Sequence, residues 1–242
     1  MPNPLRRNPG RPTARHRFLA ERLIAQKGAK PAFKGYNGFP AVLCASVNEE
    51  VVHGIPGDRV VNDGDVVSID CGAIVEGWHG DAAVTVAVGE VPDEVRELIR
   101  VTEEAMWHGI AAARLGGRVT DISHAVETYV RSQGDYGILE DYVGHGIGSA
   151  MHQPPNLPNY GRPGRGPKLV RGLALAVEPM VVLGSPDTRT LEDDWTVVTE
   201  DGRWAAHAEN TFTLTESGAW VLTALDGGEA KLTELGVPFG GM

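Results

Sequence analysis

Apolar residues recur with different periods in different parts of the sequence, and these periods separate helical from extended segments. From Val66 to Val75 the residues are apolar or β-branched almost without interruption, which is typical of a buried strand. Glu76 and Gly77 predict a turn, and the Ala- and Val-rich run 81–88 predicts the strand that returns from it. Apolar residues at helical spacing predict three helices, over residues 14–28, 92–114 and 120–132. Further strands are predicted at residues 173–182, 195–199, 207–214 and 220–223.

The order of these elements indicates the fold class. Thr120 is predicted to cap the third helix at its N-terminus, and Gly28 and Gly134 are predicted to follow helix ends. Helices and strands occur in separate runs and do not alternate, so we predict an α+β fold with antiparallel strands. Both halves contain a helix followed by a glycine-rich strand segment, but only the second half has an additional helix, 92–114.

Charge and proline content divide the chain into an arm and a body. Residues 1–13 contain four prolines and no apolar period, so we predict a disordered basic arm followed by one domain over residues 14–242. Residues 1–34 hold nine Lys or Arg against one acid, whereas the rest of the chain carries a net charge of −18. The acidic body argues against specific DNA binding, and the basic arm either contacts RNA, such as that of a ribosome, or stays solvated.

Composition excludes several other classes of protein. Hydrophobic residues make up 42% of the chain, which excludes disorder as its main state, and no apolar run is long enough to cross a membrane. The two cysteines, Cys44 and Cys71, suit a reducing cytoplasm, and we expect a cytoplasmic monomer. No phosphate-binding Walker A loop occurs, and the glycines of the segment 144–148 lack dinucleotide-binding spacing.

Candidate chemistry comes from acidic and histidine residues inside apolar or glycine-rich strand segments. An uncompensated buried carboxylate costs several kcal/mol, and a pair of bound divalent cations would compensate the whole set at once. A single acid in a strand is more often a turn cap, a charge on an edge strand or half of an ion pair. The two aspartates of the hairpin are a stronger signal, because strand register can bring them together on one face. The candidate metal ligands are Asp70, Asp81, His145, Glu178 and Glu209.

The motifs around these five residues resemble those of the type I methionine aminopeptidases. The five occur in that family's order and spacing, and the resemblance covers roughly residues 14–225. It implies the pita-bread fold, in which two pseudo-symmetric halves form a curved antiparallel sheet with helices outside. The quoted motifs are SVNE at 46–49, HGIP at 53–56, WHGD at 78–81, YVGHGIGSAMH at 142–152 and LPNY at 157–160.

The resemblance also implies an activity and a metal centre. Asp70 would bind one of two divalent ions (Co, Mn, Fe or Zn), His145 and Glu178 would bind the other, and Asp81 and Glu209 would bridge both. The two ions would activate a hydroxide that removes the initiator methionine from nascent polypeptides with a small second residue.

Further roles follow from the same resemblance. Glu178 would also relay the proton of the nucleophile, His152 would donate to the substrate backbone or the oxyanion, and His53 would contact the substrate peptide. From the residues alone, the two histidines are more often satisfied loop histidines, and the aromatic residues are more often ordinary core packing. The family positions that would form the methionine pocket are Tyr36, Phe39, Cys44, Met151 and Trp195.

The chain departs from the family pattern in two places. Members have two helices before the segment equivalent to 35–40, whereas this sequence predicts only the helix 14–28, so we expect either a shortened half with exposed apolar strand surface or a start upstream of Met1. Asn210 stands where the family has His, which we expect to affect the support of the ligands and not ligation.

Three alternatives stay open. A proline-specific aminopeptidase or dipeptidase shares the ligands but usually has an additional N-terminal domain. A type II methionine enzyme has a long insert that the ligand spacing here does not show, and a non-catalytic paralogue typically lacks ligands.

Overall fold

A long antiparallel hairpin forms the centre of the protein. The computed structural model describes residues 10–241, and its longest strands are β6 (Val66–Val75) and β7 (Trp78–Ala87), as the strand pattern predicts. Glu76 and Gly77 connect them with φ values of 52° and 87°, and a turn with positive φ at both positions matches the twist of the paired strands. The returning strand begins at Trp78, three residues earlier than predicted, because pairing with β6 continues to the turn.

The hairpin belongs to a nine-stranded sheet in which all described pairings are antiparallel. Its order is β10-β9-β11-β16-β7-β6-β2, with β17 paired to β16 and β3 paired to β6. The contact between β16 and β7 therefore joins the two halves of the chain. The remaining bounds in this sheet are β2 (Lys30–Pro31), β3 (Cys44–Val47), β9 (Gly144–Gly146), β10 (Gln153–Leu157), β11 (Ala174–Val177), β16 (Glu209–Leu214) and β17 (Ala219–Val221).

Smaller sheets extend this framework. One contains β8 (Gly137–Ile138), β12 (Met180–Val182) and β15 (Ala205–His207), and another contains β4 (Glu50–Val52), β13 (Thr188–Thr190) and β14 (Val197–Thr199). The predicted strands 173–182 and 207–214 are each divided in two, at Glu178–Pro179 and at Ala208. Each predicted strand therefore spans two sheets, and its second part pairs with different partners.

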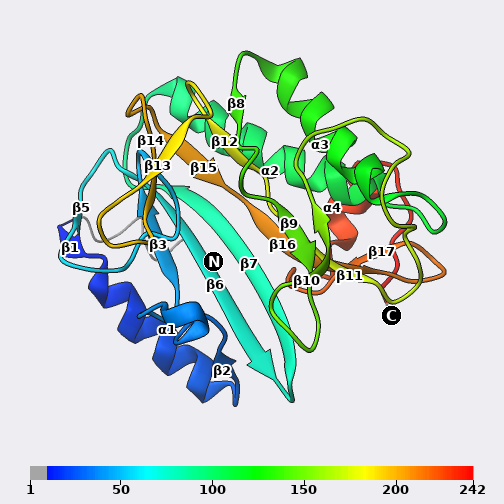
Figure 1. Ribbon diagram of the computed structural model, residues 1–242, viewed down its shortest axis with the longest axis horizontal. Coiled ribbons are helices and arrows are strands. Elements are labelled where there is room, and N and C mark those ends of the chain that lie inside the picture. Colours follow the sequence, from blue (N-terminus) through cyan, green and yellow to red (C-terminus); the bar gives the residue numbers. More distant parts are fainter. Residues whose placement is uncertain (1–9, 242) are drawn as a thin grey trace.

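Helices lie outside the sheets and are distributed unequally (Figure 1). Helices α2 (Asp93–Ala112) and α3 (Val119–Gln133) pack on each other, and α2 also packs on β15, β16, β12 and β7. The main core lies there and includes Leu98, Ile110, Ile122 and Phe212. A short helix, α4 (Glu229–Glu234), packs on α2 and was not predicted. The separate helices and antiparallel strands confirm the predicted α+β class.

In the part of the first half that the structure describes there is a single α-helix, α1 (Ala14–Gln26), which lies on the other side of the hairpin from α2 and α3 (Figure 1). None of its residues is buried, and Phe18 and Leu23 are 60% and 48% exposed. On the neighbouring hairpin, Val84 is 53% exposed. Within residues 10–241, apolar side chains of this half are therefore exposed, as the single predicted helix leads us to expect.

Two local predictions need correction. The N-cap of α3 is Arg118 and not Thr120, because the Asp121 carboxylate accepts a hydrogen bond from the Arg118 backbone N–H while the Thr120 hydroxyl donates to the carbonyl of Arg165. The predicted disordered arm lies outside the described residues up to residue 9. Arg11–Pro12, however, form a strand (β1) paired with β5 (Val60–Val61), so an arm reaching residue 13 is too long.

Candidate active site

Strand register places the five predicted ligands on one face of the sheet. Asp70 lies opposite Ala83, so Asp81, two residues away on the same strand, shares that face. Ala83 also lies opposite Glu209 across the junction between the two halves.

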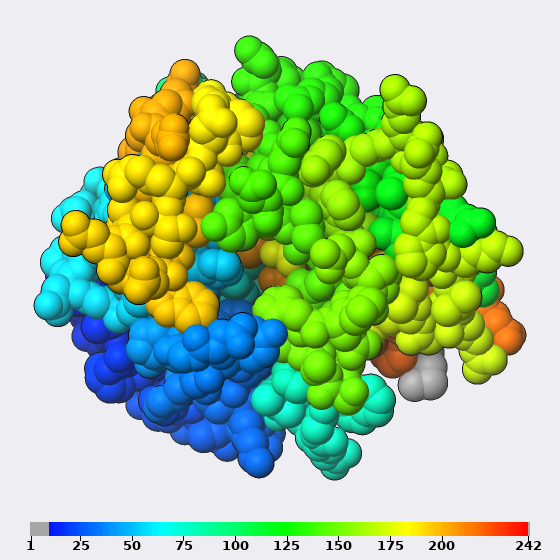
Figure 2. Space-filling view, in the orientation of Figure 1, coloured from blue at the N-terminus to red at the C-terminus, as the bar shows by residue number. Residues whose placement is uncertain are grey.

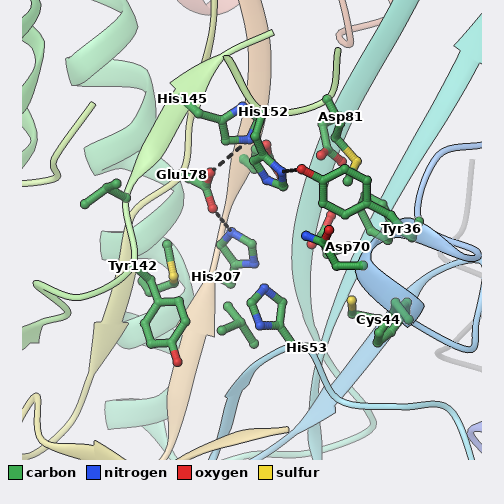
Figure 3. A pocket seen from close by; sticks show the side chains of 18 of the residues that line it. Tyr36, Cys44, His53, Asp70, Asp81, Tyr142, His145, His152, Glu178 and His207 are labelled. Atoms are coloured by element: carbon green, nitrogen blue, oxygen red, sulfur yellow. Dashed lines mark hydrogen bonds and ion pairs between the residues drawn. The ribbon is translucent and has the colours of Figure 1, made fainter. Parts of the chain in front are cut away.

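The other two ligands are connected to this face through Ala176. Ala176 lies opposite Thr211, which is two residues from Glu209 on the same strand, and on its other side it lies opposite His145. Glu178 follows Ala176 by two residues. The period of two along each strand therefore orients all five side chains to the same side, as Figure 3 shows for the labelled residues.

The side-chain atoms of this group are arranged as a metal site. Asp81, His145 and Glu209 each offer one ligand atom within 4.8 Å of the others, and so do Glu178, His207 and Glu209. Among the described residues, Asp70 Oδ1, Glu209 Oε1 and His207 Nε2 are buried without a hydrogen-bond partner. Buried polar atoms that lack a partner are costly, and divalent cations would satisfy these. The residues present therefore fit a metal centre.

Burial and mutual repulsion make the carboxylates unusually basic. Burial raises the pKa of Asp81 and of Glu178 to about 7. For Asp70 and Glu209, burial together with the negative charge of Asp81 raises the pKa well above the ordinary range. Burial lowers the pKa of His145, whose Nε2 lies 3.4 Å from Glu178 Oε1. Four acids with raised pKa values in one cavity are typical of a functional site.

An open cavity of about 520 Å³ leads to this cluster. In Figure 2 it is the hollow near the centre of the face, between the blue segment that contains Tyr36 and Phe39, the yellow segment near Trp195 and the green segment near Tyr142. Its lining is polar around the carboxylates and apolar around Phe39, Cys44 and Met151, which pack together in one cluster. The end of a polypeptide chain can therefore enter this cavity and reach the carboxylates.

The apolar side contains the residues proposed from the sequence for the methionine pocket. Phe39, Cys44 and Met151 are buried in one cluster, against which Tyr36 and Trp195 pack. The rings of Phe39 and Trp195 meet edge to face with their centroids 5.0 Å apart. The structure thus brings all five together beside the carboxylates, although residues 36 and 195 are far apart in sequence.

The two histidines proposed from the sequence also line the cavity. His152 Nδ1 lies 2.8 Å from Tyr36 Oη, and its ring centroid lies 4.2 Å from that of His145 (Figure 3). His53 has a positive φ of 60° and contacts the rings of Tyr142 and Trp195 edge to face. Burial lowers the pKa of His53 to about 4, so this imidazole is neutral at neutral pH.

His207 is a further residue of the site that the sequence patterns did not single out. This residue is buried, and its Nε2 lies 3.5 Å from Glu178 Oε2 (Figure 3). Burial lowers its pKa to about 4. The signal was present in the sequence, because His207 precedes the predicted ligand Glu209 by two residues in an extended segment and such residues share a face.

Asn210 lies on the opposite face of its strand from Glu209. Its amide donates to Met106 Sδ, and its carbonyl oxygen accepts a hydrogen bond from the Thr223 hydroxyl. The Thr223 hydroxyl also accepts a hydrogen bond from the backbone of Thr211. Asn210 therefore anchors the strand that carries Glu209 and does not point toward the carboxylates.

These features define a class of protein: a metal-dependent enzyme with an acid-rich centre at the joined halves of a curved sheet. The comparison with known families agrees, because residues 10–216 match the model of metallopeptidase family M24. The chain belongs to this family.

Relatives and solved structures make the placement more specific. The chain is 55% identical to the methionine aminopeptidase of Clostridium acetobutylicum over 216 residues, covering 89% of this chain and 86% of that protein. It is 50% identical to methionine aminopeptidase 1 of Bacillus subtilis over 215 residues, covering 89% and 86%. A crystal structure of methionine aminopeptidase from Thermotoga maritima matches with a TM-score of 0.87 at 45% identity, covering 89% of this chain and 86% of that one.

A more distant structure shows the shared fold alone. The prolidase of Pyrococcus furiosus matches with a TM-score of 0.70 at 23% identity, covering 90% of this chain but 57% of the prolidase. Together these similarities confirm the pita-bread fold expected from the sequence.

Proposed function

We propose that the protein is a methionine aminopeptidase that removes the N-terminal methionine from nascent polypeptides with a small second residue. The observation that carries the proposal is the convergence of Asp70, Asp81, His145, Glu178 and Glu209 on one face, beside an apolar pocket that opens into the same cavity. The identity of 55% and 50% to proteins named methionine aminopeptidase supports this choice within family M24.

Two divalent cations fit the donor set, in which oxygen predominates. Asp70 would hold one ion, His145 and Glu178 the other, and Asp81 and Glu209 would lie between them; Mn, Fe, Co and Zn all accept such donors. When bound, the ions polarise a carbonyl and activate water at neutral pH.

Glu178 is suited to move a proton at its carboxylate. In the metal-free protein burial raises its pKa to about 7, so this carboxylate can accept a proton near neutral pH. Its backbone is held in place, because its carbonyl accepts a hydrogen bond from the Asn159 amide at 3.1 Å. The Glu178 carboxylate therefore takes the proton from the attacking water and passes it to the leaving amine.

His152 and Tyr36 form a unit that can donate to the substrate. If the Tyr36 hydroxyl donates to His152 Nδ1, the proton of the neutral imidazole resides on Nε2. Nε2–H then donates to the oxygen of the scissile carbonyl, where negative charge develops. His53, neutral and held between Tyr142 and Trp195, is placed to contact the peptide beyond the scissile bond.

The apolar pocket explains the preference for methionine. Methionine is unbranched and its thioether packs well against aromatic rings, which Phe39 and Trp195 provide. Burial raises the pKa of the Cys44 thiol well above its ordinary range, so Cys44 lines the pocket as a small apolar group and does not act as a nucleophile.

Peptide hydrolysis tests the proposal. Purified protein loaded with Mn or Co should release methionine from Met-Ala-Ser, should not act on Met-Lys-Ser, and should lose activity with a chelator. Asp70→Asn is the matched inactive control. Release of the first residue from Xaa-Pro peptides instead would favour the proline-specific alternative, and a purified protein without stoichiometric metal would favour a non-catalytic paralogue.

We also infer a cytoplasmic monomer whose basic N-terminal arm contacts the ribosome. Both cysteines are free, which suits a reducing compartment. Among the described residues, no helix combines the length and apolar character of a membrane span. Sedimentation velocity tests the oligomeric state, and co-sedimentation with ribosomes at low and high salt tests the contact.

A further inference from the structure

His207 is held rigidly at the base of the cavity. It ends β15, lies opposite Met180, and is 2% exposed. Its backbone N–H donates to Thr85 Oγ1 at 2.8 Å, and its carbonyl accepts from the same hydroxyl at 2.7 Å. Thr85 Oγ1 in turn lies 2.7 Å from Ser68 Oγ. This network fixes the backbone of His207 to the central hairpin, so the direction of its ring is also restricted.

The ring points its free nitrogen into the metal centre. Nε2 is a buried atom without a hydrogen-bond partner, and it lies 3.5 Å from Glu178 Oε2. The other oxygen of the same carboxylate, Oε1, lies 3.4 Å from His145 Nε2. Glu178 therefore stands between two imidazoles, one at each oxygen (Figure 3).

The distances suit a shared ion. The ligand atoms of Glu178, His207 and Glu209 all lie within 4.8 Å of one another. Nitrogen and oxygen donors bind such ions at about 2.0–2.2 Å, so two donors on one ion are at most about 4.4 Å apart. Small side-chain adjustments are enough to bring the three atoms onto one ion.

We infer that His207 supplies a second imidazole nitrogen, through Nε2, to the metal bound by Glu178 and Glu209. The inference rests on the metal centre of the proposed function and adds a ligand to the five proposed from the sequence. A second imidazole shifts the preference of the site from Mn, which favours oxygen donors, toward Co, Fe and Zn.

Nitrogen NMR of the wild-type protein gives a direct test. The protein is labelled with ¹⁵N-histidine, stripped of metal and titrated with Zn²⁺. We expect the Nε2 resonances of two histidines, His145 and His207, to move to metal-bound positions together. A metal-bound shift at His145 alone, with His207 unchanged or only hydrogen-bonded, overturns the inference and leaves the proposed function intact. Absence of Zn²⁺ binding overturns both.

Variants give an independent measurement by calorimetry and X-ray absorption. H207Q should lower Co²⁺ affinity at least tenfold while Mn²⁺ affinity changes less than about threefold, and the Co²⁺-loaded variant should lose one imidazole from its ligand shell. H53Q is the matched control, because His53 lines the same cavity but lies outside both ligand groups, and its ligand shell should stay unchanged. Equal imidazole counts in wild type and H207Q contradict the inference.

Discussion

Asp81→Asn should have opposite effects on the metal-free and metal-loaded forms of the protein. Burial, followed by the charge of Glu178, raises the pKa of Asp81 from 3.8 to about 7. A carboxyl group whose pKa is higher in the folded than in the unfolded protein stabilises the fold less as pH rises. Metal-free wild type should therefore lose stability between about pH 4 and pH 7. The variant has a neutral amide at this position, so it should lack the share of this stability loss that comes from ionisation of Asp81.

The magnitude follows from the pKa in the two states. With a pKa of about 7 folded and 3.8 unfolded, ionisation of Asp81 costs on the order of 4 kcal/mol of folding free energy at pH 8. Of this, on the order of 3 kcal/mol develops between pH 5 and pH 8. The metal-free variant should exceed wild type in stability at pH 8 by a few kcal/mol, and by much less at pH 5.

Urea unfolding of chelator-treated protein at both pH values, followed by circular dichroism, measures this difference. The matched control is Asp141→Asn at the exposed rim of the cavity, which should change neither profile. In the presence of Mn²⁺ or Co²⁺ the ranking should reverse, because Asp81→Asn removes a proposed ligand and should weaken metal binding more than about 100-fold. Equal stability of metal-free wild type at pH 5 and pH 8, or a metal-free variant less stable than wild type at pH 8, would contradict a raised pKa of Asp81.

Three further predictions concern the surroundings of the metal centre. Tyr36→Phe should lower kcat about tenfold with little change in KM in steady-state assays, because His152 loses the partner that fixes its proton; an unchanged kcat would contradict this role. Gly144→Ala should abolish metal binding, measured by calorimetry, and cooperative unfolding, measured by urea titration, because a Cβ there would collide with the Ala176 carbonyl. A stable variant would show that strands β9 and β11 can move apart enough to accommodate the Cβ. Cys44→Ala should retain activity within about tenfold. In the wild-type protein, mass spectrometry should find Cys44 unmodified after iodoacetamide treatment at pH 8, since burial raises its thiol pKa; rapid labelling would count against a buried thiol.

Secondary-structure elements with strong local sequence signals could be predicted without the structure. The run from Val66 to Val75 is a strand with the predicted bounds, because a continuous β-branched segment has few other favourable conformations. The two long helices were predicted to within two residues at each end, since their apolar positions repeat at helical spacing over several turns. The candidate ligands were also visible, because acids and a histidine inside apolar or glycine-rich segments need compensation.

Contacts between distant segments, in contrast, could not be predicted from local patterns. The division of the predicted strand 173–182 at Glu178–Pro179 arises because its two parts pair in different sheets, and proline lacks the N–H needed for a continuous ladder. Thr120 lost its predicted capping role because a distant carbonyl, that of Arg165, takes its hydroxyl. The spacing of two residues from Glu209 predicts that His207 shares the face of the ligands, but it does not predict which side chain the His207 ring meets. Its place beside Glu178 comes from the pairing of β12 with β15, and such pairing depends on contacts between residues far apart in the chain, which a local pattern does not encode.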